Sequence, residues 1–226
     1  MTTVKKGFTL IELLVVLAIV GLLIAIVMPS LNRARLQAKI LSTNSDLRQI
    51  ALALECYHTE HRKYPPTRED CGSGSLKDHL FQLPPELTRG DYLPAKSPDE
   101  AMSVAMEDRF HPGRTYKYRS VGECIRDRDI IDKWTKARLW APNGFPAASS
   151  LDTDKGQWHS DIESSPIKWV VFSVGPNFDE DWLLRTAANR YPVPKELWFG
   201  YTQRKGFLIR MRLKNGSEIG SFEGNP

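Results

Sequence analysis

Residues 5–28 have the sequence KKGFTLIELLVVLAIVGLLIAIVM. From Phe8 to Met28 this segment is 21 residues long and apolar except for Thr9 and Glu12. As an α-helix with a rise of about 1.5 Å per residue, it is long enough to cross a bilayer core of roughly 30 Å. A carboxylate inside such a span is costly, so Glu12 is a candidate functional residue.

Two ordinary interpretations of this segment leave features unexplained. A secretory signal peptide has an apolar core of roughly 7–15 residues followed by a small-residue cleavage site. Here the run is longer, and Val27-Met28-Pro29 is a poor site. A lipoprotein signal needs a cysteine soon after the run, and the first cysteine is Cys56. A plain one-span anchor explains the length and the apolarity but gives Glu12 no role.

A third interpretation starts from residues 7–14, GFTLIELL. They resemble, contiguously and with a highly specific motif, the type III signal of type IV pilins and type II secretion pseudopilins. The resemblance implies that prepilin peptidase cuts between Gly7 and Phe8 on the cytoplasmic side. The same enzyme would methylate the new amine of Phe8, with S-adenosylmethionine as donor. Glycine suits the cut because it leaves the extended backbone unobstructed. The chain is then a substrate and not an enzyme.

The resemblance also gives Glu12 a partner. In the pilin family the carboxylate at this position is thought to pair with the N-terminal amine of a neighbouring subunit, which here would belong to Phe8. A buried carboxylate is tolerated when it meets a positive group, and the pair would set the register between subunits. The alternative is that Glu12, four residues into the run, reaches the cytoplasmic interface.

The flanking charges disagree with the orientation that the resemblance implies. Lys5 and Lys6 precede the span, whereas Arg33, Arg35 and Lys39 follow it. The positive-inside rule therefore weakly favours the opposite orientation. The resemblance implies a single-pass inner-membrane protein with a cytoplasmic N-terminus and a periplasmic globular domain.

The helix is expected to continue beyond the membrane, with a kink or an interrupted turn at Pro29. Beyond Pro29, residues on one helical stripe recur at steps of three and four, with Asp46 and Glu55 among those off it. Tyr64-Pro65-Pro66 ends the pattern, which predicts one helix from about residue 8 to about residue 61. The stripe consists of Leu36, Ile40, Thr43, Leu47, Ile50, Leu54 and Tyr57.

The C-terminal part predicts a small antiparallel sheet. Residues 167–174 are rich in β-branched and aromatic side chains and predict a central strand. Residues 207–213 alternate, and the hairpin signal Asn215-Gly216 predicts a partner strand over 219–222. The expected fold class is α+β, with the long helix packed on the sheet. Residues 46–57, DLRQIALALECY, resemble the major pseudopilin of type II secretion and imply the pilin fold.

The expected organisation has four parts. Residues 1–7 are the leader, 8–28 the membrane and filament-core half of the helix, and 29–64 its amphipathic half. Residues 65–226 form the globular pilin-like domain. Within this domain, residues 67–165 are polar and broken by turn signals, and we expect an enlarged loop region or insertion there.

Residues 173–181, SVGPNFDED, resemble the Ser-x-Gly-x-Asp loop that holds calcium in the major pseudopilin. The resemblance implies Ser173, Asn177, Asp179 and Asp181 as candidate ligands, since calcium prefers carboxylate and carbonyl oxygens. Asn177 departs from the usual aspartate, and the loop is short. The alternative is a solvated acidic turn.

Charge gives no global attraction to nucleic acid. The chain has 31 Lys and Arg against 27 Asp and Glu, a net charge of +4. Arg210, Arg212 and Lys214 form a basic row that could contact phosphates. Such a row is more often a solvated outer face that protects an edge strand. Nucleic-acid binding is therefore not favoured.

Catalytic signals are weak. The five histidines have no zinc-ligand spacing, and Cys56, Cys71 and Cys124 allow at most one disulfide. A membrane-anchored enzyme is the alternative from another class. It predicts an apolar pocket with convergent titratable groups, whereas a pilin predicts none.

These patterns predict a structural subunit of a type II secretion pseudopilus that supports protein export. Its expected partners are copies of itself, prepilin peptidase, other pseudopilins and the inner-membrane assembly platform. The alternative is a type IV pilus or competence pilin that works in adhesion, motility or DNA uptake.

Overall fold

The computed structural model describes residues 9–69, 75–78, 80–94, 106–128, 131–148, 151–152, 155–200 and 205–221. The chain forms two compact units, Met1–Leu41 and Ser42–Pro226. The leader and the cleavage site, residues 1–8, lie outside the described residues.

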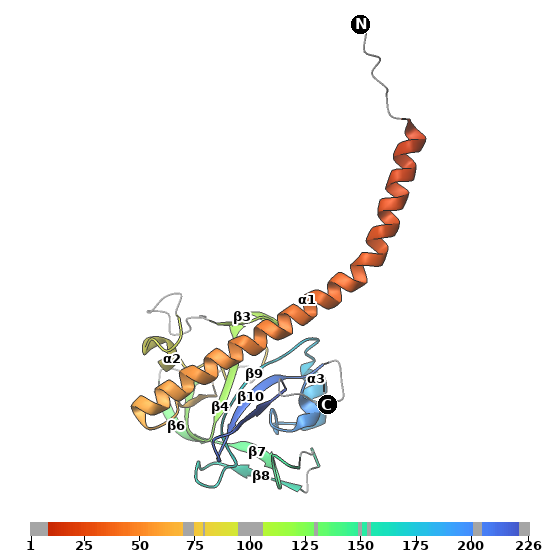
Figure 1. Ribbon diagram of the computed structural model, residues 1–226. Helices are drawn as coiled ribbons and strands as arrows, with labels where there is room; N and C mark the ends of the chain where they lie inside the picture. The colour runs from red at the N-terminus through yellow and green to blue at the C-terminus, as the bar shows by residue number, and fades with distance from the viewer. Residues whose placement is uncertain are drawn as a thin grey trace. The chain divides into compact units, whose positions relative to one another are not determined.

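Helix α1 extends from Leu10 to His61 (Figure 1), which confirms the long helix expected from the sequence. It passes through Pro29 without a break, so the interruption of a turn that this proline predicted is absent. Arg62 then takes a left-handed φ of 58°, and its amide donates to the carbonyl of His58 at 2.9 Å. A left-handed residue is a common way to end a helix.

The central sheet has the strand order β11-β10-β9-β4 and is antiparallel throughout. Its strands are β4 (Lys117–Ser120), β9 (Ile167–Ser173), β10 (Leu208–Leu213) and β11 (Glu218–Gly220). The predicted central strand and the predicted hairpin at Asn215-Gly216 are confirmed. Gly216 has a φ of 88°, which the tight turn requires and glycine adopts without strain.

Both faces of this sheet are buried. Trp169 and Arg212 contact Glu55 of α1, so one face lies against the second half of α1, as Figure 1 also shows. Ile209 and Met211 alternate with the arginines of β10 and join the core on the other face. There they pack with residues from α3 (Glu180–Ala187) and the segment after it, which includes a short 3-10 helix, Lys195–Leu197.

Residues 67–165 contain strands where the sequence predicted mainly loops. They form three further sheets with the orders β1-β5-β6, β2-β3 and β7-β8. Polar strands of two to seven residues lack the alternation that identifies a half-buried strand, because their pairing depends on neighbours distant in sequence. The elements are β1 (Thr67–Arg68), α2 (Glu86–Arg89), β2 (Glu107–Asp108), β3 (His111–Thr115), β5 (Gly122–Arg128), β6 (Ile131–Ala137), β7 (Leu139–Pro142) and β8 (Gly156–His159).

Two carboxylates of α1 join the apolar stripe in contacting the sheet. Asp46, which the periodicity placed off the stripe, is 8% exposed. Its carboxylate accepts hydrogen bonds from Arg109 Nε at 2.8 Å and from the Tyr116 hydroxyl at 2.7 Å. Glu55 Oε1 accepts from Trp169 Nε1 at 2.9 Å. The buried face of α1 is therefore wider than the stripe and includes its polar borders.

We expect Asp46→Asn to lower the free energy of unfolding by about 1–3 kcal/mol, because Tyr116 and Arg109 lose a charged acceptor in a buried place. Urea unfolding of the full chain in an uncharged detergent measures the change. Glu163→Gln is the matched control, since the side chain of Glu163 is exposed, and it should change stability by less than about 0.5 kcal/mol. Equal effects of the two substitutions would show that the Asp46 contacts contribute nothing specific.

Candidate functional site

The N-terminal half of α1 is an apolar surface that no other described residue of the unit Met1–Leu41 covers. Every residue from Leu10 to Met28 is exposed, including Leu10 at 81% and Ile26 at 68%. The most apolar 18-residue window has a mean hydropathy of 3.2, and the helix is long and apolar enough to cross a membrane. Contiguous apolar surface of this extent needs lipid or protein against it. This half of α1 is therefore the candidate anchoring and assembly surface.

Thr9 and Glu12 form hydrogen bonds to each other at the N-terminus of this helix. The Thr9 amide and hydroxyl donate to Glu12 Oε2 at 2.8 and 2.7 Å, and the Glu12 amide donates to Thr9 Oγ1 at 3.3 Å. This reciprocal arrangement is a capping box. The Thr-x-x-Glu spacing in residues 9–12 is the sequence signature of this box, from which the role of Thr9 could have been predicted.

Within the part of the chain that the structure describes, the capping box does not provide Glu12 with a cation. Glu12 accepts hydrogen bonds from the amide and hydroxyl of Thr9, which do not neutralise a carboxylate. In apolar surroundings an uncompensated charge is unfavourable, so an approaching amine would be stabilised there. Gly7 and Phe8 lie outside the described residues, so cleavage, methylation and the pairing of Phe8 with Glu12 stay predictions.

The predicted calcium loop uses its side chains for other contacts. The Ser173 hydroxyl donates to Asp108 Oδ1 at 2.6 Å. Asp179 caps α3, since its Oδ1 accepts from the Trp182 amide at 3.0 Å, and its Oδ2 lies 3.3 Å from Lys205 Nζ. Asp181 lies in the first turn of the same helix.

These contacts give the candidate side chains other roles, and calcium binding at this loop stays a prediction. Among the described residues, no group of three or more His, Cys, Asp and Glu side chains could hold a metal ion. Asn177 is exposed and has a left-handed φ of 55° at the turn before α3. The acidic pattern of residues 177–181 thus corresponds to a turn and a helix cap, with Asp179 as the capping residue.

Asp108 is a buried carboxylate that the sequence did not single out. It is 0% exposed in β2, where it accepts from the Ser173 hydroxyl and from the Val174 amide at 3.0 Å. The Phe110 amide also donates to it, at 2.9 Å. Burial raises the pKa of Asp108 above that of an ordinary aspartate. No local pattern marks such a residue, because two of its three donors, Ser173 and Val174, lie 65 and 66 residues away in the sequence.

The basic row on β10 is packed rather than solvated, which corrects our expectation of an outer face on an edge strand. Strand β10 lies between β9 and β11. Arg210 is 5% exposed and pairs with Glu218, whose other oxygen lies 3.3 Å from Arg212 Nη1. Lys214 donates to the carbonyl of Glu163.

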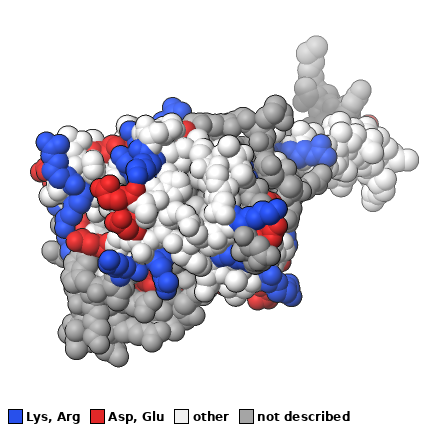
Figure 2. Space-filling view, turned by 90° about the horizontal axis from the view of Figure 1, so that it is seen from below, with Lys and Arg blue, Asp and Glu red and all other residues white. Residues whose placement is uncertain are grey.

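The face of the molecule in Figure 2 shows no continuous basic track among the described residues. On the face that Figure 2 shows, basic and acidic residues lie among one another, and a broad area between them is uncharged. Recognition of a phosphate backbone needs a continuous basic track. With Arg210 and Arg212 paired to Glu218, the β10 row is not such a track.

Among the described residues, no disulfide bond constrains the fold. Cys56 is an exposed, free cysteine on α1. Cys124 is buried in β5, with its Sγ 3.8 Å from the carbonyl oxygen of Ile125. Cys71 lies outside the described residues. The predicted limit of one disulfide therefore stays a prediction.

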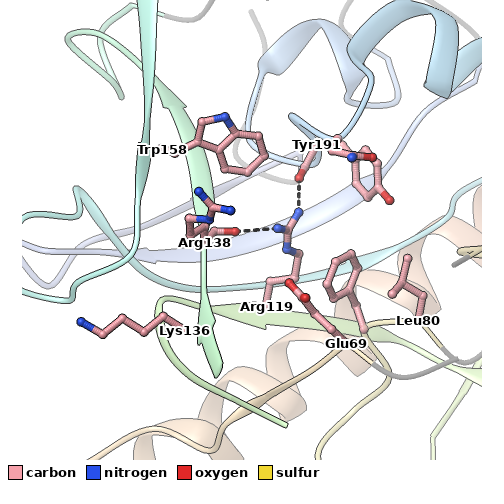
Figure 3. Close-up of a pocket in the computed structure, with 9 residues that line it drawn as sticks. Glu69, Leu80, Arg119, Lys136, Arg138, Trp158 and Tyr191 are labelled. Atoms are coloured by element: carbon pink, nitrogen blue, oxygen red, sulfur yellow. Dashed lines mark hydrogen bonds between the residues drawn. The ribbon is translucent and has the colours of Figure 1, made fainter. Parts of the chain in front are cut away.

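A cavity of about 490 Å³ lies in the unit Ser42–Pro226, although the pilin interpretation predicted no pocket. Its lining includes Arg119, Lys136 and Arg138 together with Glu69 (Figure 3). No serine, cysteine or histidine is among its described lining residues, whose titratable side chains are Glu69, Arg119, Lys136, Arg138 and Tyr191. This largely polar lining differs from the apolar pocket predicted for an anchored enzyme.

Comparison with known proteins tests the resemblance drawn from the motif. Residues 3–28 match the family described as the prokaryotic N-terminal methylation motif. The chain is 32% identical over 155 residues to the type II secretion system core protein G of Dickeya chrysanthemi. These 155 residues are 69% of this chain and 87% of the relative. The chain belongs to the family of type II secretion system core protein G.

Other relatives of core protein G and of the pilins match over shorter segments. The core protein G of Pseudomonas aeruginosa is 40% identical over 65 residues, which are 29% of this chain and 46% of the relative. The type IV major pilin protein PilE1 of Neisseria gonorrhoeae is 34% identical over 97 residues, or 41% and 52% of the two chains. The chain thus spans about half the length of these two relatives. No solved structure matches it.

Membership of the core protein G family confirms the resemblance drawn from residues 7–14 and 46–57. The long α1 and the small antiparallel sheet agree with the α+β pilin fold expected from the sequence. Strands β1 to β3 and β5 to β8 occupy the region that we expected to be enlarged.

We expect calcium to leave the thermal stability of the full chain unchanged, because Ser173 and Asp179 already have protein partners. Melting in an uncharged detergent is compared with 2 mM calcium and with excess chelator, concentrations on the order of the weaker sites of extracellular proteins. A rise of several degrees with calcium, lost in Asp181→Asn, would restore the predicted site.

The raised pKa of Asp108 predicts a pH dependence with a definite sign. Between the ordinary pKa of aspartate, about 3.9, and the raised value, the folded chain binds more protons at this residue than the unfolded chain. The stability of the wild type relative to Asp108→Asn should therefore fall as pH rises through that window. Urea unfolding at several pH values measures the slope.

Asp179 provides the contrast for this measurement. The Trp182 amide and Lys205 lower its pKa, so its contribution is present above the ordinary pKa and lost as pH falls through the lowered value. The difference between the wild type and Asp179→Asn should then have the opposite slope. Slopes of the same sign for both substitutions would contradict the assignment for Asp108.

Proposed function

We propose that this chain is a structural subunit of a type II secretion pseudopilus, a filament that supports protein export. Kinship with core protein G over 155 residues supports this function, as does the match of residues 3–28 to the N-terminal methylation motif. The main observation behind this proposal is the exposed apolar half of α1, which begins with the Thr9–Glu12 capping box.

In this proposal the apolar half of α1 lies in two different environments. Before assembly, Leu10 to Met28 anchor the subunit in the inner membrane, with the unit Ser42–Pro226 on the periplasmic side. During assembly the same surface leaves the lipid and packs against the helices of neighbouring subunits. Both the membrane-anchored and the assembled state are favourable, because each state removes the exposed apolar side chains from water.

Processing prepares the N-terminus for this contact. Prepilin peptidase cuts between Gly7 and Phe8 and methylates the amine of Phe8, which then lies one residue before the capping box. The ammonium of one subunit pairs with Glu12 of its neighbour. A pair of opposite charges in apolar surroundings costs much less than either charge alone, so it favours one vertical register of the helices.

Other pseudopilins and the inner-membrane assembly platform are the further partners in this proposal. The chain carries out no reaction of its own, in keeping with relatives that are subunits of a secretion system or of a pilus.

A type IV pilin is the second candidate, because PilE1 relatives match over 97 residues. The two functions differ in their phenotype. Deletion of a pseudopilin abolishes export of secreted proteins into the medium and leaves surface pili in place, whereas deletion of a pilin removes the pili.

We expect Glu12→Ala to leave processing intact and to reduce filament assembly strongly, because the Phe8 amine loses its charged partner. Mass spectrometry of the purified chain should show loss of the seven leader residues and one methyl group on Phe8. Recovery of sheared filaments by sedimentation measures assembly.

Thr9→Ala is the matched control, since it removes the other half of the capping box and keeps the carboxylate. Its assembly should be reduced much less than that of Glu12→Ala. Normal filaments from Glu12→Ala would refute the pairing. Equal defects in the two variants would assign Glu12 to helix capping alone.

A further inference from the structure

The cavity of about 490 Å³ in the unit Ser42–Pro226 has no place in the proposed assembly through α1. It lies among β4, the end of β6, β8 and the segment that follows α3 (Figure 3). Its volume falls in the range of ordinary ligand pockets. Its charged and aromatic lining consists of Glu69, Arg119, Lys136, Arg138, Trp158 and Tyr191.

Arg119 places a buried positive charge on the wall of this cavity. It is 4% exposed, and its guanidinium donates to the carbonyls of Tyr191 and Arg138, both at 2.6 Å. The same group lies 4.2 Å from the centre of the Phe81 ring. Among the described residues, no carboxylate forms an ion pair within 4.0 Å of it. Carbonyls and a ring face solvate the cation, and Glu69 is the carboxylate that acts on it electrostatically from the same lining.

The remaining charges leave the cavity with an excess of positive charge. Lys136 and Arg138 line it as well, and both are exposed. Glu69 is the only acidic residue among its described lining residues. Three cations thus face one carboxylate, and a ligand that brings a negative group would gain from all three. The rigid fork of arginine favours a planar carboxylate with two oxygens.

The aromatic residues that line the cavity indicate which class of ligand it binds. Trp158 is 43% exposed although it is a large aromatic side chain, and Tyr191 forms another part of the lining. Half-exposed aromatics beside arginine are typical of protein-recognition surfaces. A nucleic acid would need basic residues along a track, whereas these three cations surround one cavity.

We propose that this cavity binds a carboxylate of an acidic, aromatic-containing peptide segment from a partner protein. Arg119 and Arg138 contact the carboxylate, Lys136 adds long-range attraction, and Trp158 packs against an apolar side chain of the segment. The carboxylate comes from an Asp or Glu side chain or from a chain terminus. This inference goes beyond the proposed function and does not depend on cleavage at Gly7 or on Glu12.

Isothermal titration of the full chain in dodecyl maltoside tests the proposal. The probe is the N-acetylated, C-amidated peptide Gly-Phe-Glu-Asp-Phe-Gly. Its counterpart Gly-Phe-Gln-Asn-Phe-Gly, prepared with an amidated and with a free C-terminus, distinguishes side-chain from terminal carboxylates. We expect the neutral amidated peptide to bind at least about tenfold more weakly than the acidic one. Tight binding of the free-terminus form would identify the terminal carboxylate as the source.

The variant Lys136→Gln with Arg138→Gln removes two cavity charges and keeps the Arg138 carbonyl that Arg119 needs. We expect it to weaken binding of the acidic peptide about tenfold. Lys155→Gln with Arg185→Gln is the matched control, because both side chains are exposed, neither lines the cavity, and the net charge changes equally. It should change binding by less than about twofold.

Three results would overturn the proposal. The first is no difference between acidic and neutral amidated peptides together with no binding of the free-terminus form. The second is equal loss of binding in the cavity variant and the control. The third is binding of inorganic phosphate, titrated under the same conditions, when none of the peptides binds. Arg119 is left unchanged throughout, because its buried contacts support the fold.

Discussion

The part of α1 from Thr43 to Tyr57 depends on the fold of the unit Ser42–Pro226 to cover its apolar stripe. Leu47, Ile50 and Leu54 are completely buried, and burial of each such side chain contributes roughly 1.5–3 kcal/mol. Asp46 and Glu55 add hydrogen bonds and ion pairs at the borders of the stripe. These contacts determine which face of the sheet meets the helix.

That constraint explains why the charged residues of β10 are inside. Successive side chains of a strand point to opposite faces, so Ile209 and Met211 occupy the core on one side. Arg210 and Arg212 must then point toward α1. Their charges are acceptable there because Glu218 on β11 and Glu55 on α1 lie opposite. The helix and the sheet thus have complementary apolar and charged surfaces.

No described residue covers the first half of α1 in this way. Lipid or another molecule must therefore remove its apolar side chains from water. Its residues are apolar on every side, which suits lipid on all sides or several neighbouring helices. Thr9 satisfies the hydrogen bonds of Glu12 within the subunit but not its charge. Under the proposed function, the same segment is therefore adequate for a subunit in the membrane and better satisfied in a filament.

The sequence alone predicted the long helix and its end near His61, the central strand and the β10–β11 hairpin. These elements follow from local rules: helical periodicity, proline restriction and the Asn-Gly turn. It also indicated the family, because residues 7–14 and 46–57 carry contiguous stretches that resemble the pilins and the major pseudopilin. The tertiary structure was needed for the short strands of residues 67–165, the burial of Asp46, Asp108 and Arg210, and the cavity around Arg119. Asp46, Asp108 and Arg119 depend on partners far away in the sequence, whereas Arg210 pairs with Glu218 across the β10–β11 hairpin. No local pattern records that such a partner lies beside a buried charge.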